Sequence, residues 1–340
     1  ARMKQKLEEN KGIPAQLLWM LAVISGLSVA NLYYNQPLLN RISEDLDISE
    51  FTANLIPMTT QIGYALGLLF IIPLGDLYNR KHIIVVNFLL LVAATCSIAS
   101  SSSVPYILAA SLVTGVCSVM PQIFIPIAAQ FSLPQNKARN VGMMVSGLLT
   151  GILGSRVVSG FVGEYWGWRT MYYIAAVLML LCIFLILRVL PDMPSNFKGT
   201  YGGLMKSLFS LYRNQPTIRM VSVRAGCCFG SFLALWACLA FKLSGEPFHA
   251  GNNVIGMLGL CGIAGALTAS FVGSLVHKLG VRFFTYLGCG LMILAWVVMY
   301  MLQNFYIGFI IGIVVIDIGM QCIQLSLIHI SEPTRLRCIS

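Results

Sequence analysis

The ten residues from 72 to 81 decide the fold, because a similar stretch returns later in the chain. They read Ile-Pro-Leu-Gly-Asp-Leu-Tyr-Asn-Arg-Lys, and residues 273–282 read Gly-Ser-Leu-Val-His-Lys-Leu-Gly-Val-Arg. Each stretch follows one apolar segment and precedes another. The offset of 201 residues also carries position 83 to 284 and position 105 to 306, where two further apolar segments begin. The sequence therefore predicts an internal duplication.

The composition is typical of a membrane protein. Of the 340 residues, 57% are hydrophobic and 10% are charged, and the mean hydropathy is +0.81. Soluble domains carry about 25% charged residues, so this chain cannot cover a surface in water. Its net charge of +10 does not indicate nucleic-acid binding, because the cations are dispersed rather than gathered in a stripe.

Ten apolar segments are long enough to cross a bilayer, which takes about 20 residues. They are 15–37, 52–73, 83–102, 105–128, 141–163, 170–190, 217–241, 253–273, 284–302 and 305–324. With the N-terminus in the cytoplasm, fifteen Lys and Arg lie on the inside and three lie in outside loops. This asymmetry follows the positive-inside rule and accounts for the net charge.

The two loop copies resemble a motif of the major facilitator superfamily, Gly-x-Leu-x-Asp-Arg-x-Gly-Arg-Arg/Lys. The first copy keeps Leu74, Asp76, Arg80 and Lys81, and the second keeps Gly273, Leu275, Gly280 and Arg282 but has His277 in place of the Asp. Residues 33–39, Tyr-Tyr-Asn-Gln-Pro-Leu-Leu, and residues 167–169, Gly-Trp-Arg, resemble a bacterial branch of efflux-type members. The resemblance covers about residues 15–324.

The resemblance implies an all-α polytopic membrane protein with a major-facilitator-like fold. Six spans precede the long loop and four follow it, which predicts a six-helix bundle and an incomplete second bundle, ten of the family's twelve spans. It also implies a secondary active transporter of the bacterial inner membrane, an antiporter that moves a small solute by alternating access in proton-coupled efflux.

The chain is expected to divide into five parts. These are a cytoplasmic N-terminus (1–14), a six-helix bundle (15–190), a cytoplasmic linker (191–216), an incomplete four-helix bundle (217–324) and a non-native tail (325–340). The tail is suspected because residues 325–335, Leu-Ser-Leu-Ile-His-Ile-Ser-Glu-Pro-Thr-Arg, match the translation of a common sequencing adapter. The alternative is a natural cytoplasmic tail.

The repeated loops form a candidate cytoplasmic gate. A carboxylate can accept hydrogen bonds from helix N-terminal amides and pair with Arg, which would hold the cytoplasmic helix ends together in one state. The candidate residues are Asp76, Arg80, Lys81, Lys278 and Arg282. The alternative is that the cations only fix the orientation of the chain in the membrane.

Polar residues follow one helical face in three spans, 15–37, 105–128 and 305–324, which predicts either a hydrated cavity or hydrogen bonds between helices. Aromatic residues near these faces could stack on a ligand or only pack. The candidate cavity residues are Asn31, Tyr34, Asn35, Ser118, Gln122, Trp236 and Gln321. In the family that the chain resembles, spans 1, 4, 7 and 10 line the central cavity.

Three charged residues lie within spans and away from the span ends: Arg156, Arg224 and Asp317. A lone Arg at mid-membrane costs about 2.5–3.5 kcal/mol on insertion scales, so a partner is expected. We hypothesise that Arg156 pairs with Asp317 or shares a polar cavity with it, and that Asp317 responds to protons. The alternative is a static structural pair.

Small residues repeat every fourth position in two spans, which favours close helix contact. The first set is Gly147, Gly151, Ser155, Ser159 and Gly163, and the second is Gly262, Ala266, Ser270 and Ser274. The sequence therefore predicts that spans 141–163 and 253–273 touch each other.

The sequence motifs do not indicate any other function. The sequence has neither a His-Glu-x-x-His pair nor a phosphate-binding Gly-Lys loop, and its ten cysteines lack metal spacing. We expect no enzyme activity, cofactor or metal. The expected partners are a small-molecule solute, membrane lipid and protons, without nucleic acid or ATP, and the chain is expected to be a monomer. The alternatives are a non-transporting receptor or sensor and a non-functional truncated transporter fragment.

Overall fold

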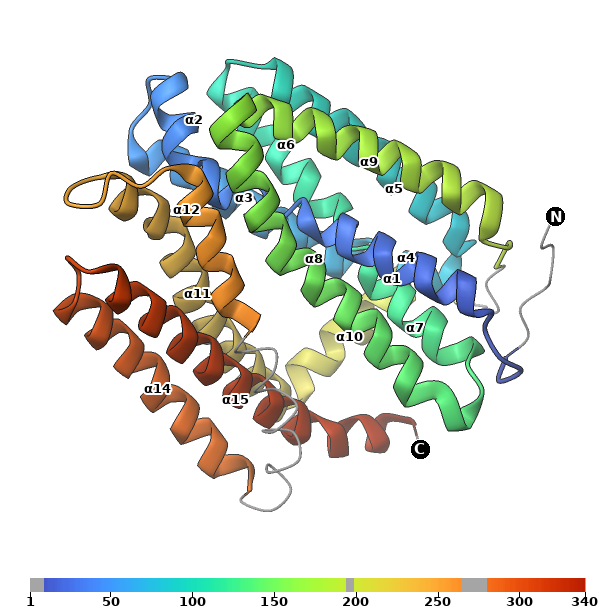
Figure 1. Cartoon of the computed structure of the whole chain (residues 1–340). Coiled ribbons are helices and arrows are strands. Elements are labelled where there is room, and N and C mark those ends of the chain that lie inside the picture. The colour runs from blue at the N-terminus through green and yellow to red at the C-terminus, as the bar shows by residue number, and fades with distance from the viewer. Residues whose placement is uncertain (1–8, 194–198, 264–279, 340) are drawn as a thin grey trace. The chain divides into compact units, whose positions relative to one another are not determined.

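The computed structural model describes residues 9–193, 199–263 and 280–339 (Figure 1). All regular secondary structure in these ranges is helical. The chain divides into two compact units. The first comprises residues 1–205 and 251–256, and the second comprises residues 206–250 and 257–340.

Eight helical stretches within the described residues are long and apolar enough to cross a membrane. They are 50–77, 80–100, 104–131, 134–166, 168–189, 216–244, 282–301 and 306–324. The predicted spans 15–37 and 253–273 contain shorter apolar helices, Ala15–Ala30 and Asn252–Cys261, and residues 264–273 lie outside the described residues. A multi-pass helical architecture is confirmed, whereas the predicted count of ten spans is not.

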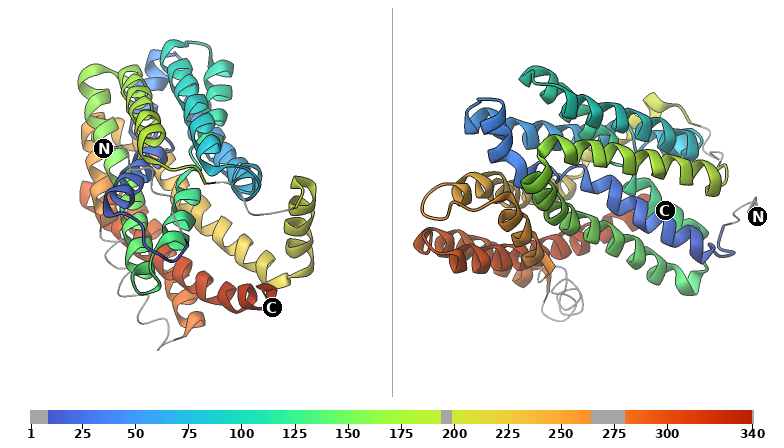
Figure 2. Two further views of the ribbon diagram at one scale, coloured as in Figure 1. Left: turned by 90° about the vertical axis from the view of Figure 1, so that its right-hand side faces the viewer. Right: turned by 45° about the horizontal axis from the view of Figure 1, so that its top comes forward.

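The first unit is a helix bundle. Its α-helices are α1 (Ala15–Ala30), α2 (Leu39–Asp45), α3 (Glu50–Phe70), α4 (Leu74–Leu77), α5 (Arg80–Ser100), α6 (Val104–Cys117), α7 (Pro121–Phe131), α8 (Lys137–Trp166) and α9 (Trp168–Val189), with the 3₁₀ turns η1 (Gln36–Leu38) and η2 (Pro134–Asn136). The most extensive packing pairs α1 with α8, α3 with α6 and α5 with α9 (Figure 1, Figure 2).

Local chemistry sets several helix ends in this unit. Ser49 caps α3, because its Oγ accepts a hydrogen bond from the Thr52 amide at 3.2 Å, and Asn79 caps α5 through Oδ1 and the Lys81 amide at 3.0 Å. Gly167 separates α8 from α9 with a φ of +86°, a conformation that favours glycine. Each cap satisfies amide groups that the helix leaves without a backbone partner.

Glycines let the backbones of α3 and α6 approach each other closely. A Cβ atom on Gly115 would lie 2.0 Å from the carbonyl oxygen of Thr60, and one on Gly63 would lie 2.1 Å from that of Leu112. A larger side chain at either position would force the helices apart. Such close packing stabilises helix pairs where lipid removes the hydrophobic driving force.

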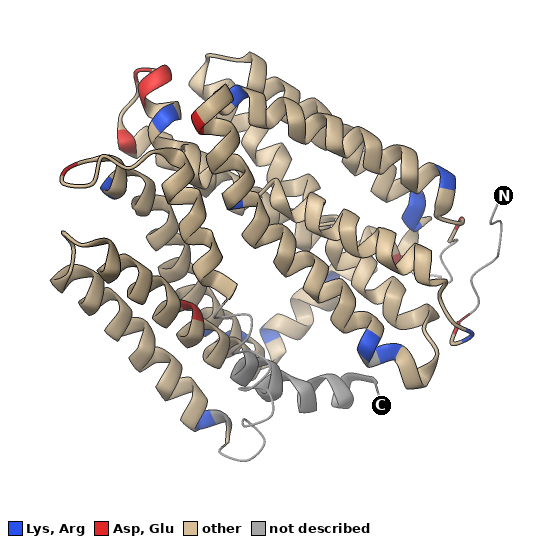
Figure 3. Cartoon of the chain, in the orientation of Figure 1, with Lys and Arg blue, Asp and Glu red and all other residues tan. Residues whose placement is uncertain are grey.

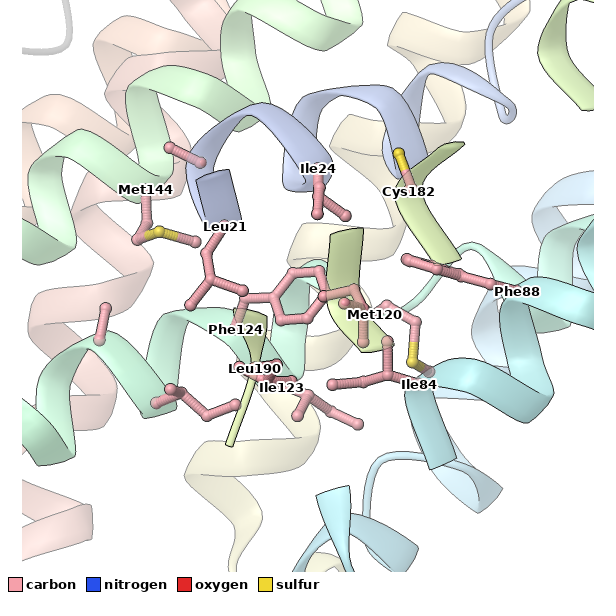
Figure 4. Close-up of a cluster of buried hydrophobic side chains, with 14 of the residues drawn as sticks. Leu21, Ile24, Ile84, Phe88, Met120, Ile123, Phe124, Met144, Cys182 and Leu190 are labelled. Atoms are coloured by element: carbon pink, nitrogen blue, oxygen red, sulfur yellow. The ribbon is translucent and has the colours of Figure 1, made fainter. Parts of the chain in front are cut away.

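Two apolar clusters fill the interior of the first unit. One gathers side chains from α1, α5, α7 and α9, where the rings of Phe88 and Phe124 meet edge to face at 6.4 Å (Figure 4). The other includes Tyr34, Ile98 and Trp168. Asn31, directly after α1, belongs to neither cluster but is buried.

The remaining helices form the second unit and the connections to it. They are α10 (Tyr201–Asn214), α11 (Pro216–Ser244), α12 (Asn252–Met257), η3 (Leu258–Cys261), α14 (Val281–Met301) and α15 (Tyr306–Ile339). In the second unit α15 packs along α14 and against α11. The segment expected to be a linker, 191–216, therefore contains a helix, and α15 continues through residue 325, where a tail was expected to begin.

Candidate functional site

The first predicted span does not continue as one helix to residue 37. It stops at Ala30, and residues 31–35 form turns that lead into η1. The side-chain amide of Asn31 donates to two carbonyl oxygens in the last turn of the helix, those of Leu27 at 2.9 Å and Ser28 at 3.2 Å. Asn side chains compete in this way with helical backbone bonds. Non-helical backbone at membrane depth is tolerated where protein buries it or where it lines a cavity.

This interrupted segment supplies partners for the buried Arg156 of α8. The Arg156 side chain is 1% exposed, and its Nε donates a hydrogen bond to Oε1 of Gln36 at 2.8 Å. The guanidinium carbon also lies 5.0 Å from the centre of the Tyr33 ring, within the range of a cation–π interaction. The first unit thus supplies this cation with an amide oxygen and an aromatic face.

Sequence reasoning missed Gln36. The signal was present, since Gln36 is a polar residue inside an apolar segment, next to Asn35 and directly before Pro37. The predicted partner, Asp317, lies in α15 of the second unit. The pairing of Arg156 with Asp317 therefore stays a prediction.

The polar face predicted for span 105–128 is interrupted as well. The α6 helix ends at Cys117 and α7 begins at Pro121. The hydroxyls of Thr114 and Ser118 donate to carbonyl oxygens of their own helix, Ala110 at 2.9 Å and Thr114 at 2.7 Å. These two residues therefore satisfy their hydroxyl protons locally, whereas Gln122 reaches another helix through the Tyr64 hydroxyl at 3.4 Å.

Several buried polar atoms on α1, the turns after it and α6 have no hydrogen-bond partner within the described part of the protein. They are the hydroxyls of Ser25, Ser28 and Ser111 and the amide oxygens of Asn31 and Asn35. Most buried polar atoms in proteins are paired with protein or water, because burying an unpaired one costs about 1–3 kcal/mol. This set of acceptors favours contact with water or a polar ligand.

A cavity of about 560 Å³ lies between α1, α8 and α9 in the first unit. Trp19, Val23, Gly151 and Leu178 are among its lining residues. Of the predicted cavity residues in this unit, Tyr34 lines the cavity, whereas Asn31, Asn35, Ser118 and Gln122 do not. Its lining is mainly apolar, so it differs in chemistry from the polar site that the sequence predicts.

Three candidate residues lie on α11 and α15 of the second unit. Trp236 is buried in α11, Arg224 is exposed on the same helix, and Gln321 is half-buried in α15. Asp317 is also buried in α15. The structure places these residues within their own unit, so a cavity shared with Asn31 or Gln122 stays a prediction.

The loop that contains Asp76 links several helix ends in the first unit. Arg80 lies 3.8 Å from the Asp76 carboxylate, donates to the Gly75 carbonyl at 3.2 Å and donates to Oε1 of Gln130 at 2.9 Å. Lys81 donates to the Leu187 carbonyl at 3.3 Å. Arg80 therefore joins α4 to the end of α7, and Lys81 joins α5 to the end of α9. Lys278 lies outside the described residues, and Arg282 is exposed in the first turn of α14.

A second polar cluster lies on the far side of the first unit. Trp168 donates from Nε1 to the Asp45 carboxylate at 3.1 Å, Arg169 donates to the same oxygen, and Arg169 also donates to the Ser101 carbonyl at 3.3 Å. The hydrogen bond from Arg169, followed by that from Trp168, lowers the pKa of the Asp45 carboxyl. The Gly-Trp-Arg motif thus joins α9 to α2 and to the α5–α6 connection.

Most charges of the first unit are segregated between these two ends. Figure 3 shows acidic residues gathered around α2, where a few cations also lie, whereas Lys and Arg predominate at the opposite ends of α5, α8 and α9. The acidic residues near α2 are Glu44, Asp45, Asp47 and Glu50. This distribution is consistent with helices that cross a membrane between two differently charged sides.

The predicted contact between spans 141–163 and 253–273 occurs where α12 meets α8 in the first unit. A Cβ atom on Gly160 would lie 2.5 Å from the Asn252 carbonyl oxygen, and one on Gly256 would lie 2.4 Å from that of Arg156. The backbone amide of Asn252 also donates a hydrogen bond to the Glu164 carboxylate at 2.8 Å. Neither Gly160 nor Gly256 belongs to the predicted sets, although a Cβ atom on Gly163 of the first set would lie 3.7 Å from Nδ2 of Asn252. Gly147 and Gly151 of the first set instead contact α1.

Comparison with known proteins identifies close relatives. A family model described as Major Facilitator Superfamily matches residues 18–332. The uncharacterized transporter YgaY of Escherichia coli O157:H7 is 36% identical over 317 residues, which are 93% of this chain and 80% of that protein. A Streptomyces coelicolor protein named "Probable transporter SCO4007" is 31% identical over 282 residues, 82% of this chain and 66% of that protein.

Solved structures of transporters share the fold. A bacterial homolog of the human lysosomal transporter Spinster, in an inward-facing and unoccupied conformation, superimposes with a TM-score of 0.74 at 18% identity and covers 93% of this chain and 74% of that one. The nucleoside transporter NupG gives a TM-score of 0.75 at 12% identity over 94% of this chain and 82% of that one.

Proposed function

The chain belongs to the Major Facilitator Superfamily, and we propose that it is a secondary active transporter that exports a small solute in exchange for protons by alternating access. It is a multi-pass membrane protein whose relatives are named as transporters. Membership of the family does not specify the direction of transport, the coupling ion or the mechanism, so these three points are what is proposed.

The buried Arg156 is the observation that carries the proposal. A guanidinium at membrane depth is costly, and this one is bound by two neutral side chains, Gln36 and Tyr33. Asp317 would attract Arg156 when ionised and release it when protonated. Proton binding would then change the interactions between α8 and α15 and shift the balance between two states.

The solute is proposed to bind among polar residues of both units. Among the described residues, the buried amide oxygens of Asn31 and Asn35 have no hydrogen-bond partner, which supports a hydrated pocket in the first unit. Ser118 and Gln122 would extend it along α6 and α7. The proposed contributors from the second unit are Trp236, Gln321 and Arg224.

The orientation and the gate are also proposed. The segregated charges support a cytoplasmic N-terminus in a bacterial inner membrane, with Arg80 and Lys81 on the cytoplasmic side. The hydrogen bonds of these two residues support a role in holding the cytoplasmic helix ends together, with Lys278 and Arg282 as counterparts in the second half. The protein would act as a monomer.

The test is a resistance screen followed by vesicle transport. Cells that express the chain are compared with cells that express Asp317→Asn across a panel of toxic compounds, and everted vesicles are then assayed with any compound that separates the two. The proposal predicts accumulation that requires a proton gradient and is lost in Asp317→Asn. Accumulation that is unchanged by the substitution or by collapse of the gradient would contradict proton coupling.

A further inference from the structure

The helix between the two units, α10, is strongly amphipathic. With 3.6 residues per turn, all of its large apolar side chains fall within an arc of about 160°. These residues are Tyr201, Leu204, Met205, Leu208, Phe209, Leu211 and Tyr212. The opposite arc holds the two cations and the small and polar residues, namely Gly202, Gly203, Lys206, Ser207, Ser210, Arg213 and Asn214. No position breaks this division.

The apolar face of α10 is exposed. None of the fourteen residues of the helix is buried, and Phe209, Tyr212 and Leu208 are 70%, 44% and 38% exposed. A helix this short is marginal on its own in water. Its exposed apolar face therefore requires a partner that can accept Phe209 and its neighbours.

Both ends of α10 are fixed next to membrane-spanning helices. At its start, the Tyr201 hydroxyl donates to the carbonyl oxygen of Phe70, the last residue of α3, at 3.1 Å. At its end, only Gln215 separates Asn214 from Pro216, where the spanning helix α11 begins. A helix that is bonded to the end of α3 and precedes α11 by one residue is therefore held near the ends of two apolar helices.

The cations lie where an anionic surface would meet them. Lys206 and Arg213 are two turns apart on the same edge of α10, each within about 60° of Phe209 around the helix. Long cationic side chains at the border of an apolar face can extend toward lipid headgroups while the apolar face enters the acyl boundary.

We propose that α10 binds the surface of the membrane, with Phe209 and its apolar neighbours inserted at the acyl boundary and Lys206 and Arg213 bound to anionic headgroups. Helices of this composition lie in the plane of the interface, and cations next to an anionic leaflet strengthen that binding. The inference is independent of the solute and of the coupling ion.

Photo-crosslinking in the full chain tests the proposal. A photo-reactive amino acid replaces Phe209 in one variant and Ser210 in another, and both are reconstituted in nanodiscs of phosphatidylcholine with or without phosphatidylglycerol. Phe209 lies on the apolar arc and Ser210 on the polar arc, so the lipid adduct is expected at 209 and lost at 210. Adding phosphatidylglycerol is expected to increase the adduct at 209.

A charge variant separates lipid binding from protein packing. In the double variant Lys206→Gln/Arg213→Gln, phosphatidylglycerol should no longer increase the lipid adduct at position 209. The double variant Lys206→Arg/Arg213→Lys keeps both charges and should retain the increase. A thermal melt of each variant confirms that it is folded. Adducts at 209 that form with protein rather than lipid, equal lipid adducts at 209 and 210, or an anionic-lipid effect that survives charge removal would each overturn the proposal.

Discussion

Arg156 of α8 donates a hydrogen bond from Nε to Oε1 of Gln36 over 2.8 Å, and 120 residues of sequence separate the two side chains. The bond joins a long membrane helix to the turn that follows α1. It also binds a buried guanidinium to a neutral acceptor, so that the acceptor can be removed without changing the net charge.

Removing that acceptor should destabilise the protein. Gln36→Leu keeps a similar volume but leaves Nε of Arg156 without this partner, and we expect a loss of about 1–3 kcal/mol. The measurement is the thermal unfolding temperature in detergent. Gln122→Leu is the matched control, because the Gln122 amide makes a longer bond of 3.4 Å and is only half-buried. Equal losses in both variants would contradict the role assigned to Gln36.

The contact between α1 and α8 makes a second prediction. A Cβ atom on Gly151 would lie 2.2 Å from the carbonyl oxygen of Gly26, whereas one on Gly154 would meet nothing within 4 Å. Gly151→Ala should therefore force the helices apart and strongly reduce the yield of folded protein. Gly154→Ala should fold normally and gain a few tenths to about 1 kcal/mol, because alanine favours helix. Gel filtration in detergent and thermal melts distinguish these outcomes, and similar behaviour of the two variants would refute the packing.

The Asp45 cluster predicts a pH dependence. Hydrogen bonds from Arg169 and Trp168 lower the pKa of the Asp45 carboxyl in the folded protein. Its contribution to stability is therefore present above the unfolded pKa of about 3.9 and is lost as the pH falls through the lower folded value. Because the cluster is partly exposed, the contribution should not exceed about 1 kcal/mol.

Comparison with Asp45→Asn measures this contribution. The wild type should melt at a higher temperature than the variant at pH 7, and the difference should shrink as the pH is lowered below about 4. A difference that grows on acidification has the wrong sign for a lowered pKa and would exclude this account of the cluster.

The loop around Arg80 predicts a local change in dynamics. Arg80→Gln removes donors to the Gly75 carbonyl and to Gln130. Amide hydrogen exchange should therefore accelerate in residues 74–78 and near the end of α7. Arg139→Gln changes an exposed cation in the first turn of α8 and serves as the control. If exchange in residues 74–78 stays unchanged in Arg80→Gln, the loop is held by other contacts.

Much of the fold follows from apolar segment length. Long apolar runs have to become helices in a bilayer because the backbone has no other partner there, so most of the predicted spans correspond to candidate spans in the structure. The interruptions at Asn31 and between Cys117 and Pro121 were not predicted, because hydropathy does not register how a side chain competes with the helical backbone.

The site was predictable only in part. Burial of a cation in a span indicates that Arg156 needs partners, but the sequence pattern does not specify which distant residue supplies one. Gln36 and Tyr33 are brought to Arg156 by the packing of α1 against α8, which depends on the close approach of Gly26 and Gly151. The helix α10 was not predicted either, because its amphipathic pattern falls in the segment 191–216, which was predicted to be a linker.

The accessibility of residue 35 tests the central claim of alternating access most directly. Asn35→Cys is placed in a form of the protein in which the ten cysteines of the chain are replaced, and a membrane-impermeant maleimide is applied to right-side-out and to inside-out vesicles. A carrier predicts modification from both sides while the vesicles stay impermeable to the reagent. Modification from neither side would contradict the proposal that this segment borders a pocket open to each side in turn.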